Sequence, residues 1–223
     1  TLGVINVLYG AVVTVRQTDL KRLVAFSSIS HMGYVLIGLS AIASKGVDAA
    51  SVGLTGASMQ MFTHGTITGL MFLTVGMIYD RTHTRYIPDL GGLSNRIPLI
   101  GVAFLIAGLA SLGLPGTSGF AAEILVFLGA FSVWPWLTAL AVFGVVITAG
   151  YILWMAQRTL FGPMNNRWEK LTDATKLELI PIGMLIVVIL LFGIYPAFLT
   201  DLFKMGVEPI VAAVTSSPEI LNR

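Results

Sequence analysis

The sequence contains no cysteine and has little charge for its length. Because none of the 223 residues is Cys, disulfides, thiolate metal sites, iron–sulfur ligation by this chain and cysteine nucleophiles are excluded. Charged residues make up 11% of the chain and hydrophobic residues 56%, whereas a soluble globular domain carries about 25% charged residues. A chain so poor in charge cannot cover its own surface with polar groups. We therefore expect lipid to be the solvent for much of it.

Long stretches without charge locate the membrane-spanning helices. A helix needs about 20 apolar residues to cross the hydrocarbon core of a bilayer. Tryptophans flank Pro135, which is typical of a turn at the membrane interface. The charge-poor stretches predict an all-α, polytopic membrane helix bundle with six spans: 1–15, 23–44, 49–79, two within 97–157 that turn at Pro135, and 179–200.

The basic residues are divided unequally between the two sides of this predicted bundle. If every span crosses, ten of them fall on one side: Arg16, Lys21, Arg22, Arg81, Arg85, Arg96, Arg158, Arg167, Lys170 and Lys176. The other side holds three: Lys45, Lys204 and Arg223. The positive-inside rule therefore places the first side in the cytoplasm or its equivalent. Because the basic residues form short clusters and no basic face, we expect no nucleic-acid partner.

The span 97–131 is too long for a single crossing, and its middle contains a sequence that favours a break. Its 35 residues exceed what tilt accommodates. Gly113, Pro115 and Gly116 lie within Gly-Leu-Pro-Gly-Thr-Ser-Gly, where Pro removes a backbone donor and the glycines loosen the chain. A kink is the alternative, but the motif from Gly113 to Gly119 predicts two half-helices. Broken helices of this kind frame ion sites in many transporters.

One acidic residue lies deep in the predicted membrane region. Glu123 is the only charged residue between Ile97 and Gln157, and it follows the predicted break by about two helical turns. An ionisable side chain at such depth is costly and is by default a functional candidate. We expect Glu123 to take up and release protons. The alternative is a structural ion pair with a neighbouring helix or subunit.

Two histidines lie within predicted spans. His64 is at the centre of 49–79, with Gln60 one turn before it and threonine hydroxyls nearby, and His31 shares a helix face with Ser27. Imidazole relays protons near neutral pH because either ring nitrogen can donate or accept. We therefore expect both histidines to transfer protons. The alternatives are a neutral His64 hydrogen-bonded between helices and a His31 that serves helix packing.

Charged residues at the ends of two spans are candidates for proton uptake from the basic side. Asp19 and Lys21 begin the second span, and Asp80 ends the third. Ordinary anchoring of helix ends at the interface is the alternative for all three.

Three separated motifs carry a resemblance to a known family: residues 19–33 (DLKRLVAFSSISHMG), 79–85 (YDRTHTR) and 110–120 (ASLGLPGTSGF). Together they resemble the antiporter-like subunits of respiratory complex I, an NADH–quinone oxidoreductase, over nearly all of residues 1–200. In sibling subunits the last ionisable position is usually lysine, so Glu123 favours the chain M branch, called subunit 4 in mitochondria. Subunits of multisubunit cation/proton antiporters and of membrane-bound hydrogenases share the fold and are the alternative.

The resemblance implies an organisation and a role for each candidate residue. Residues 1–203 correspond to the second of two inverted repeats with the last helix, and 204–223 form a C-terminal tail. His31 and His64 belong to a central hydrophilic axis, and Glu123 is its terminal ionisable group. The first repeat is missing, and we expect the chain to be the C-terminal part of a larger protein that does not pump alone.

The resemblance also implies a function and partners. The chain would translocate protons within an H⁺-translocating NADH:quinone oxidoreductase, driven by quinone reduction elsewhere. NADH, FMN, iron–sulfur clusters and quinone would be bound by partner subunits and no cofactor by this chain. Its partners would be other complex I membrane subunits, especially neighbouring antiporter-like subunits, with lipid and protons. We expect a bacterial inner membrane, with an organellar inner membrane or thylakoid as the alternative.

Two other classes of function remain open on the residues alone. A stand-alone sodium/proton antiporter would show cation-dependent activity without quinone. A purely structural membrane scaffold would tolerate Glu123→Gln and His64→Ala.

Overall fold

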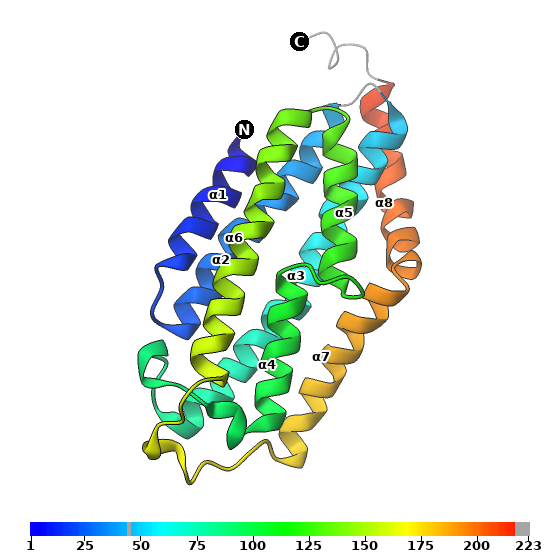
Figure 1. Cartoon of the computed structure of the whole chain (residues 1–223). Coiled ribbons are helices and arrows are strands. Elements are labelled where there is room, and N and C mark those ends of the chain that lie inside the picture. Colours follow the sequence, from blue (N-terminus) through cyan, green and yellow to red (C-terminus); the bar gives the residue numbers. More distant parts are fainter. Residues whose placement is uncertain (44–45, 217–223) are drawn as a thin grey trace.

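The computed structural model describes residues 1–43 and 46–216, and α-helices make up most of them (Figure 1). The helices are α1 (Leu2–Val15), α2 (Leu20–Ser40), α3 (Val47–Thr82), α4 (Pro98–Ser111), α5 (Ser118–Phe131), α6 (Pro135–Leu160), α7 (Lys176–Ile194) and α8 (Ala197–Thr215). Short 3-10 turns lie at Ala41–Ala43, Ile87–Asp89, Leu93–Asn95 and Asn166–Trp168. The described residues contain no β-strand, only an isolated bridge between Asp19 and Tyr86. The predicted all-α fold is confirmed.

The helices account for the predicted membrane spans. Four are long and apolar enough to cross a membrane: Leu20–Ala43, which is α2 with the turn after it, and α3, α6 and α7. The apolar helices α1, α4 and α5 have 14 residues each. Because α5 continues the direction of α4 through the bundle (Figure 1), the two cross as one broken helix. The six spans therefore correspond to α1, α2, α3, α4 with α5, α6, and α7.

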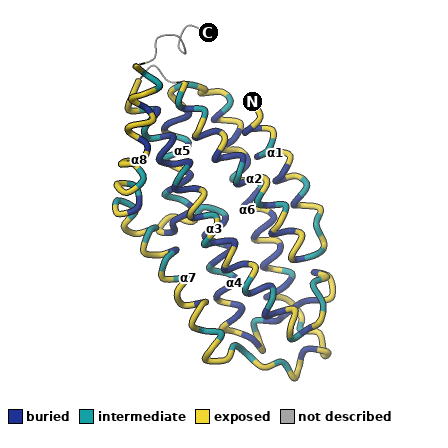
Figure 2. Tube along the Cα trace, turned by 180° about the vertical axis from the view of Figure 1, so that it is seen from behind, coloured by how far each residue is buried: buried dark blue, intermediate teal, exposed yellow. Residues whose placement is uncertain are grey.

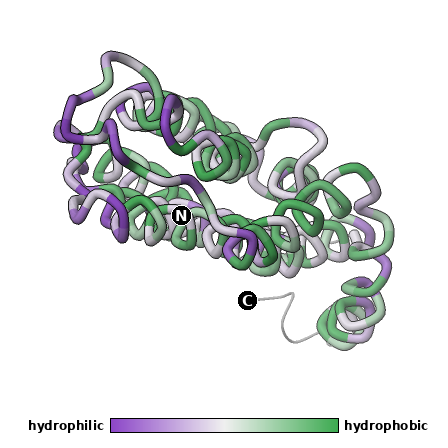
Figure 3. The backbone as a smooth tube through the Cα atoms, turned by 90° about the horizontal axis from the view of Figure 1, so that it is seen from below, coloured by the Kyte–Doolittle hydropathy of each residue, from purple (hydrophilic) through white to green (hydrophobic). Residues whose placement is uncertain are grey.

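The outer surface of the bundle is apolar over most of its height. Large hydrophobic side chains are exposed on α6 and α7, among them Phe143, Val146, Leu153, Met184 and Val187. Exposed residues follow the outward sides of the helices (Figure 2), and many hydrophilic residues lie in the connecting loops (Figure 3). A soluble protein rarely exposes a contiguous apolar patch larger than a few hundred Å². This surface is suited to lipid.

The loops that carry most of the basic residues lie together at one end of the bundle (Figure 1). The amide of Leu20 donates to the carbonyl of Arg85 at 2.9 Å, which joins the α1–α2 connection to the α3–α4 loop. The amide of Gly92 donates to the carbonyl of Phe161 at 3.2 Å, which joins that loop to the end of α6. The predicted topology requires this arrangement. Of the three basic residues predicted on the other side, Lys45 and Arg223 lie outside the described residues.

The C-terminal region differs from the predicted span 179–200. Helix α7 ends at Ile194 and α8 begins at Ala197, because Pro196 restricts the backbone of the residue before it. The predicted tail 204–223 begins inside α8. There, Val207 and Val211 pack against Ala50 and Leu54 of α3. The described part of the predicted tail therefore covers the bundle as a helix.

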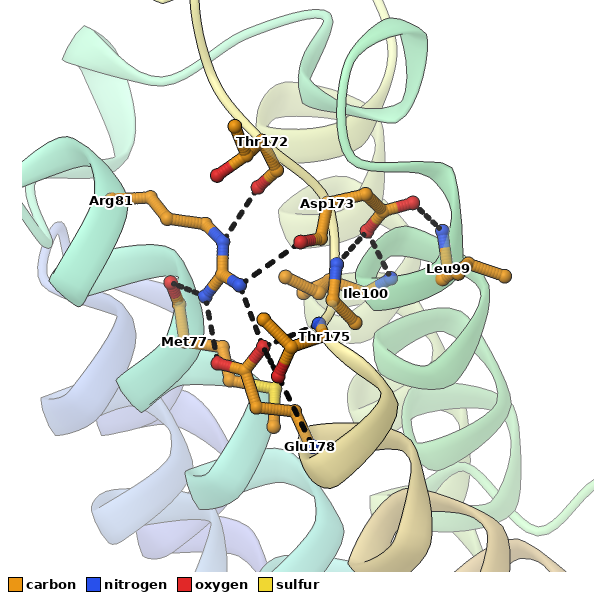
Figure 4. Close-up of polar contacts among 9 residues, drawn as sticks. Met77, Arg81, Leu99, Ile100, Thr172, Asp173, Thr175 and Glu178 are labelled. Atoms are coloured by element: carbon orange, nitrogen blue, oxygen red, sulfur yellow. Dashed lines mark hydrogen bonds and ion pairs between the residues drawn. The ribbon is translucent and has the colours of Figure 1, made fainter.

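An ion pair fixes the start of α7 to the end of α3 (Figure 4). The guanidinium of Arg81 donates to both carboxylate oxygens of Glu178, at 3.1 and 2.8 Å. It also donates to the backbone carbonyls of Thr172 and Asp173, at 2.7 and 3.2 Å. Planar, bidentate pairing of this kind is geometrically specific. Arg81 therefore sets where α7 starts and holds the loop before it.

The same loop caps α4. The Asp173 carboxylate accepts from the amides of Leu99 at 2.8 Å and Ile100 at 3.3 Å (Figure 4). The first amides of a helix lack intrahelical partners and attract negative charge. Thr175 and Glu178 form a capping box at the start of α7. The lower half of the broken helix and α7 are thus fixed to one loop.

Helices α3 and α5 approach each other at glycines. A Cβ on Gly129 would overlap the backbone of Gly53, and a Cβ on Gly56 would lie 2.5 Å from the amide nitrogen of Val126. Small residues let membrane helices pack backbone to backbone. This crossing holds α5 against the centre of the bundle.

We expect Gly129→Ala to destabilise the protein and Gly76→Ala to leave it as stable or slightly more stable. The first Cβ overlaps α3, and overpacking typically costs about 1–3 kcal/mol. A Cβ on Gly76 of α3 would meet nothing within 4 Å. Ala also favours a helix over Gly by about 1 kcal/mol. The measurement is the melting temperature of the purified protein in detergent. Equal melting temperatures for the two variants would contradict the close α3–α5 approach.

Candidate functional site

The predicted helix break is present at the middle of the bundle. Helix α4 ends at Ser111 and α5 begins at Ser118, and Gly113 and Gly116 have left-handed backbone angles of φ 79° and 90°. Glycine adopts such angles without steric cost. The break predicted at Gly113–Gly119 is confirmed, with Gly119 inside the first turn of α5. Thr117 occupies the N-cap position, but its hydroxyl donates to the Leu114 carbonyl at 2.7 Å and makes no side-chain cap.

Glu123 is buried beside the break, with 5% of its surface exposed. Its Oε1 lies 3.7 Å from Nδ1 of His31 on α2. Its Oε2 lies over Gly113, where a Cβ would be only 2.7 Å away. Gly113 therefore serves twice, since it permits the turn and leaves room for the carboxyl group.

The two predicted histidines lie side by side. His31 is buried, and its Nε2 hydrogen-bonds with Oγ of Ser111, the last residue of α4, at 3.2 Å. His64 on α3 is partly buried, and its Nε2 hydrogen-bonds with Oγ of Ser28 at 3.1 Å. The two imidazole centroids are 5.2 Å apart. The structure thus brings the three predicted ionisable groups into one row, His64 to His31 to Glu123.

A small polar cavity of about 10 Å³ lies along this row. A cavity of about 10–15 Å³ on this measure holds one water molecule. Within the described part of the chain, Oε1 of Gln60 and the hydroxyl of Ser118 are buried and have no hydrogen-bond partner. The cavity is lined by His31, Gln60, Thr63, His64, Ile67, Ala110, Ser111, Gly119 and Glu123. A water here could bridge the separated groups.

The charged residues predicted for proton uptake lie away from this row. Asp19 accepts a hydrogen bond from the amide of Arg22 at 2.9 Å as the N-cap of α2, and it pairs with Arg85 at 3.5 Å. Its position is twelve residues before His31, about 18 Å along the helix. Lys21 and the acidic residue Asp80 are exposed. The contacts of Asp19 are those of a helix anchor.

Sequence reasoning missed three polar residues near the row. Ser111 could have been found, because it lies two residues before Gly113, where the broken-helix motif begins. Tyr34 lies one turn after His31 on α2, with ring centroids 6.1 Å apart. Tyr151 on α6 has no local signal, because only the packing of α6 brings it close. No group of three His, Asp or Glu side chains among residues 1–43 and 46–216 could hold a metal ion.

The chain is similar in sequence to known proteins over most of its length. Residues 1–148 match the family described as NADH:quinone oxidoreductase/Mrp antiporter, transmembrane. The chain is 41% identical over 211 residues to NADH-quinone oxidoreductase subunit M of Rhodobacter capsulatus, covering 94% of this chain and 40% of the relative. It is 40% identical to F(420)H(2) dehydrogenase subunit M of Methanosarcina mazei, and the match covers 95% of this chain and 41% of the relative. The chain spans about two fifths of the length of these relatives.

Solved structures show the same fold. Respiratory complex I from Thermus thermophilus with bound NADH contains a chain that matches with a TM-score of 0.85 and 32% identity, over 99% of this chain and 44% of that one. The Mrp complex from Dietzia contains a chain that matches with a TM-score of 0.83 and 21% identity, over 99% of this chain and 49% of that one. The second likeness shows the fold alone.

We expect Gly113→Ala to impair proton transfer far more than Gly116→Ala. Both residues have positive φ, so both variants strain the backbone, but only the Cβ at position 113 meets Glu123. A displaced reacting group can lower a rate by about a hundredfold. The measurement is acidification of vesicles that contain the protein in its complex. Equal losses in the two variants would mean that backbone strain, and not the position of Glu123, controls transfer.

Proposed function

The chain belongs to the NADH:quinone oxidoreductase/Mrp antiporter transmembrane family, and we propose that it is part of a proton-translocating membrane subunit of an NADH:quinone oxidoreductase. We assign it to the chain M (subunit 4) type, which the relative from Rhodobacter capsulatus supports. The observation that carries the proposal is the row of His64, His31 and Glu123 beside a helix break. Buried ionisable groups in series are what a proton relay through a membrane requires.

Proton exchange between His31 and Glu123 is the central step. One proton on the pair gives either a neutral acid beside a neutral imidazole or a carboxylate beside an imidazolium, and both states have zero net charge. The separation of 3.7 Å exceeds a hydrogen bond. A small side-chain movement or a bridging water is therefore needed for transfer. The pair would therefore have two states, one in which a proton can pass between His31 and Glu123 and one in which it cannot.

His64 extends the relay toward α3. A proton on His31 can pass to His64 through water or through the hydroxyls of Ser111 and Ser28, to which the two rings are hydrogen-bonded. Repulsion between two cationic rings 5.2 Å apart disfavours loading both at once. Protonation of one histidine would thus favour release of the proton from the other.

The driving energy comes from elsewhere in the complex. Moving one charge through 100 mV costs about 2.3 kcal/mol. We propose that quinone reduction in partner subunits, which hold NADH, FMN, iron–sulfur clusters and quinone, alters the charges along this row. The chain itself binds no cofactor, and neighbouring antiporter-like subunits are its partners. A bacterial inner membrane is the proposed location, with an organellar inner membrane or thylakoid as the alternative.

A subunit of a cation/proton antiporter is the second candidate. The matched family includes Mrp antiporters, and the Dietzia complex shares the fold. Such a protein would exchange sodium for protons without quinone. Dependence of activity on sodium, in the absence of quinone, separates the two candidates.

We expect Glu123→Gln in the intact complex to lower NADH:quinone turnover by about tenfold or more and to lower the number of protons moved per electron. Gln keeps the volume of the side chain but cannot carry a proton. The measurement is simultaneous NADH oxidation and vesicle acidification. The matched control is Glu208→Gln on α8, because Glu208 is exposed. Unchanged turnover and stoichiometry in Glu123→Gln would overturn the proposed role and favour a structural scaffold.

A further inference from the structure

Several hydroxyl groups of the described residues are buried without a hydrogen-bond partner, and three of them lie on α2 and α6 near the row. Tyr34 on α2, and Thr148 and Tyr151 on α6, have 0%, 2% and 1% of their surface exposed. None of the three hydroxyls has a hydrogen-bond partner within residues 1–43 and 46–216. Buried polar groups are nearly always satisfied by protein or by ordered water. Since the described residues offer these three hydroxyls no partner, water is the group that fits them.

The three hydroxyls follow one contact between two helices. Tyr34 shares its face of α2 with His31, one turn away. Its hydroxyl reaches α6 at Gly144, where a Cβ would lie 3.1 Å from it. Thr148 is one turn and Tyr151 two turns beyond Gly144 on the same face of α6, toward the basic end of the bundle. The series therefore descends about 10 Å along α6 from the level of Tyr34.

The series lies beside the row of ionisable groups. The ring centroids of Tyr34 and His31 are 6.1 Å apart. Ser27 lies one turn before His31 on the same face of α2. The Ser27 hydroxyl donates to the Val24 carbonyl at 2.8 Å and can still accept. The series thus ends beside His31, whose Nδ1 lies 3.7 Å from Oε1 of Glu123.

The other end of the series reaches an open cavity. Tyr151 lines a cavity of about 660 Å³ between the end of α1 and α6. Arg16 and Thr18 lie at its basic end, and both are exposed. The remaining lining residues are Val15, Ile147, Gly150 and Trp154.

We propose that Tyr34, Thr148 and Tyr151 form a hydroxyl path that carries protons between this cavity and the Glu123–His31 pair. The path rests on the proposed function, since it supplies the relay with protons from the basic side. It is separate from the helix-end residues Asp19, Lys21 and Asp80 considered above. Its ligand is the proton, held on ordered water between the hydroxyls.

Each step of the path conserves atoms and charge. A hydroxyl oxygen accepts a proton from the water before it, so one O–H bond forms. It then releases its own proton to the next water or hydroxyl, so one O–H bond breaks. After the last hydroxyl, Tyr34, the proton reaches the Glu123–His31 pair. Rotation of the hydroxyls restores the starting arrangement, and no oxidant or reductant is needed.

Packing alone does not explain these hydroxyls. A phenylalanine or a valine fills almost the same volume without a buried polar group. Leaving a buried hydroxyl without a protein partner destabilises a fold, and replacing it by an apolar group of the same shape is often neutral or stabilising. A packing role and a proton-conducting role therefore predict different results for the same substitution.

The test compares Tyr151→Phe, Thr148→Val and Thr148→Ser in the intact complex. We expect Tyr151→Phe and Thr148→Val to slow proton transfer by about tenfold and to raise the ratio of the rates in H₂O and D₂O, because proton delivery becomes limiting. Thr148→Ser keeps the hydroxyl and should retain most of the rate. The melting temperature should not fall. Tyr9→Phe on the exposed face of α1 is the control and should leave every readout unchanged.

The outcomes separate the path from the proposed function. Unchanged rates in Tyr151→Phe and Thr148→Val, with loss of rate in Glu123→Gln, would overturn the path and leave the relay intact. Slower transfer with a lower melting temperature and an unchanged isotope ratio would show a structural role and overturn the path. Full activity in Glu123→Gln would overturn the proposed function and the path with it.

Discussion

The contact between the Glu123 carboxyl and the backbone of Gly113 is the constraint on which the rest of the site depends. A carboxyl group at the depth of the membrane is costly to ionise, and here it lies beside the break between α4 and α5. Because Gly113 has φ 79° and no side chain, the turn can form and Oε2 can lie against it. Oε1 is then directed at His31. The break thus orients the acid as well as interrupting the helix.

The packing of the bundle holds both sides of this break. Helix α5 is pressed against α3 at glycines, and α4 is capped by the loop that Arg81 also binds. That guanidinium pairs with Glu178 at the start of α7. At the other end of α7, a Cβ on Gly193 would overlap the backbone of Gly116 and Thr117. Helix α7 therefore connects the charged loops at the basic end to the break itself, so a displacement of those loops would be felt beside Glu123.

The sequence predicted much of this structure because its strongest signals are local. The absence of charge locates the spans, and the Gly-Leu-Pro-Gly motif locates the break. Burial of Glu123 follows from its position within an apolar stretch. The sequence could not predict the end of α7 at Ile194, since hydrophobicity continues across it and only Pro196 marks it. Nor could it pair Tyr34 with Tyr151, because two buried tyrosines on separate helices look like ordinary core residues until α2 and α6 are packed.

Exchange of a proton between Glu123 and His31 during turnover is the central step of the proposed mechanism. Infrared difference spectroscopy of the intact complex, comparing the resting and quinone-reducing states, tests it most directly. We expect a carbonyl stretching band from a protonated carboxyl that changes between the two states and is absent from Glu123→Gln. A difference spectrum that is the same in the wild-type protein and in that variant would mean that Glu123 keeps one protonation state, which would contradict the proposed mechanism.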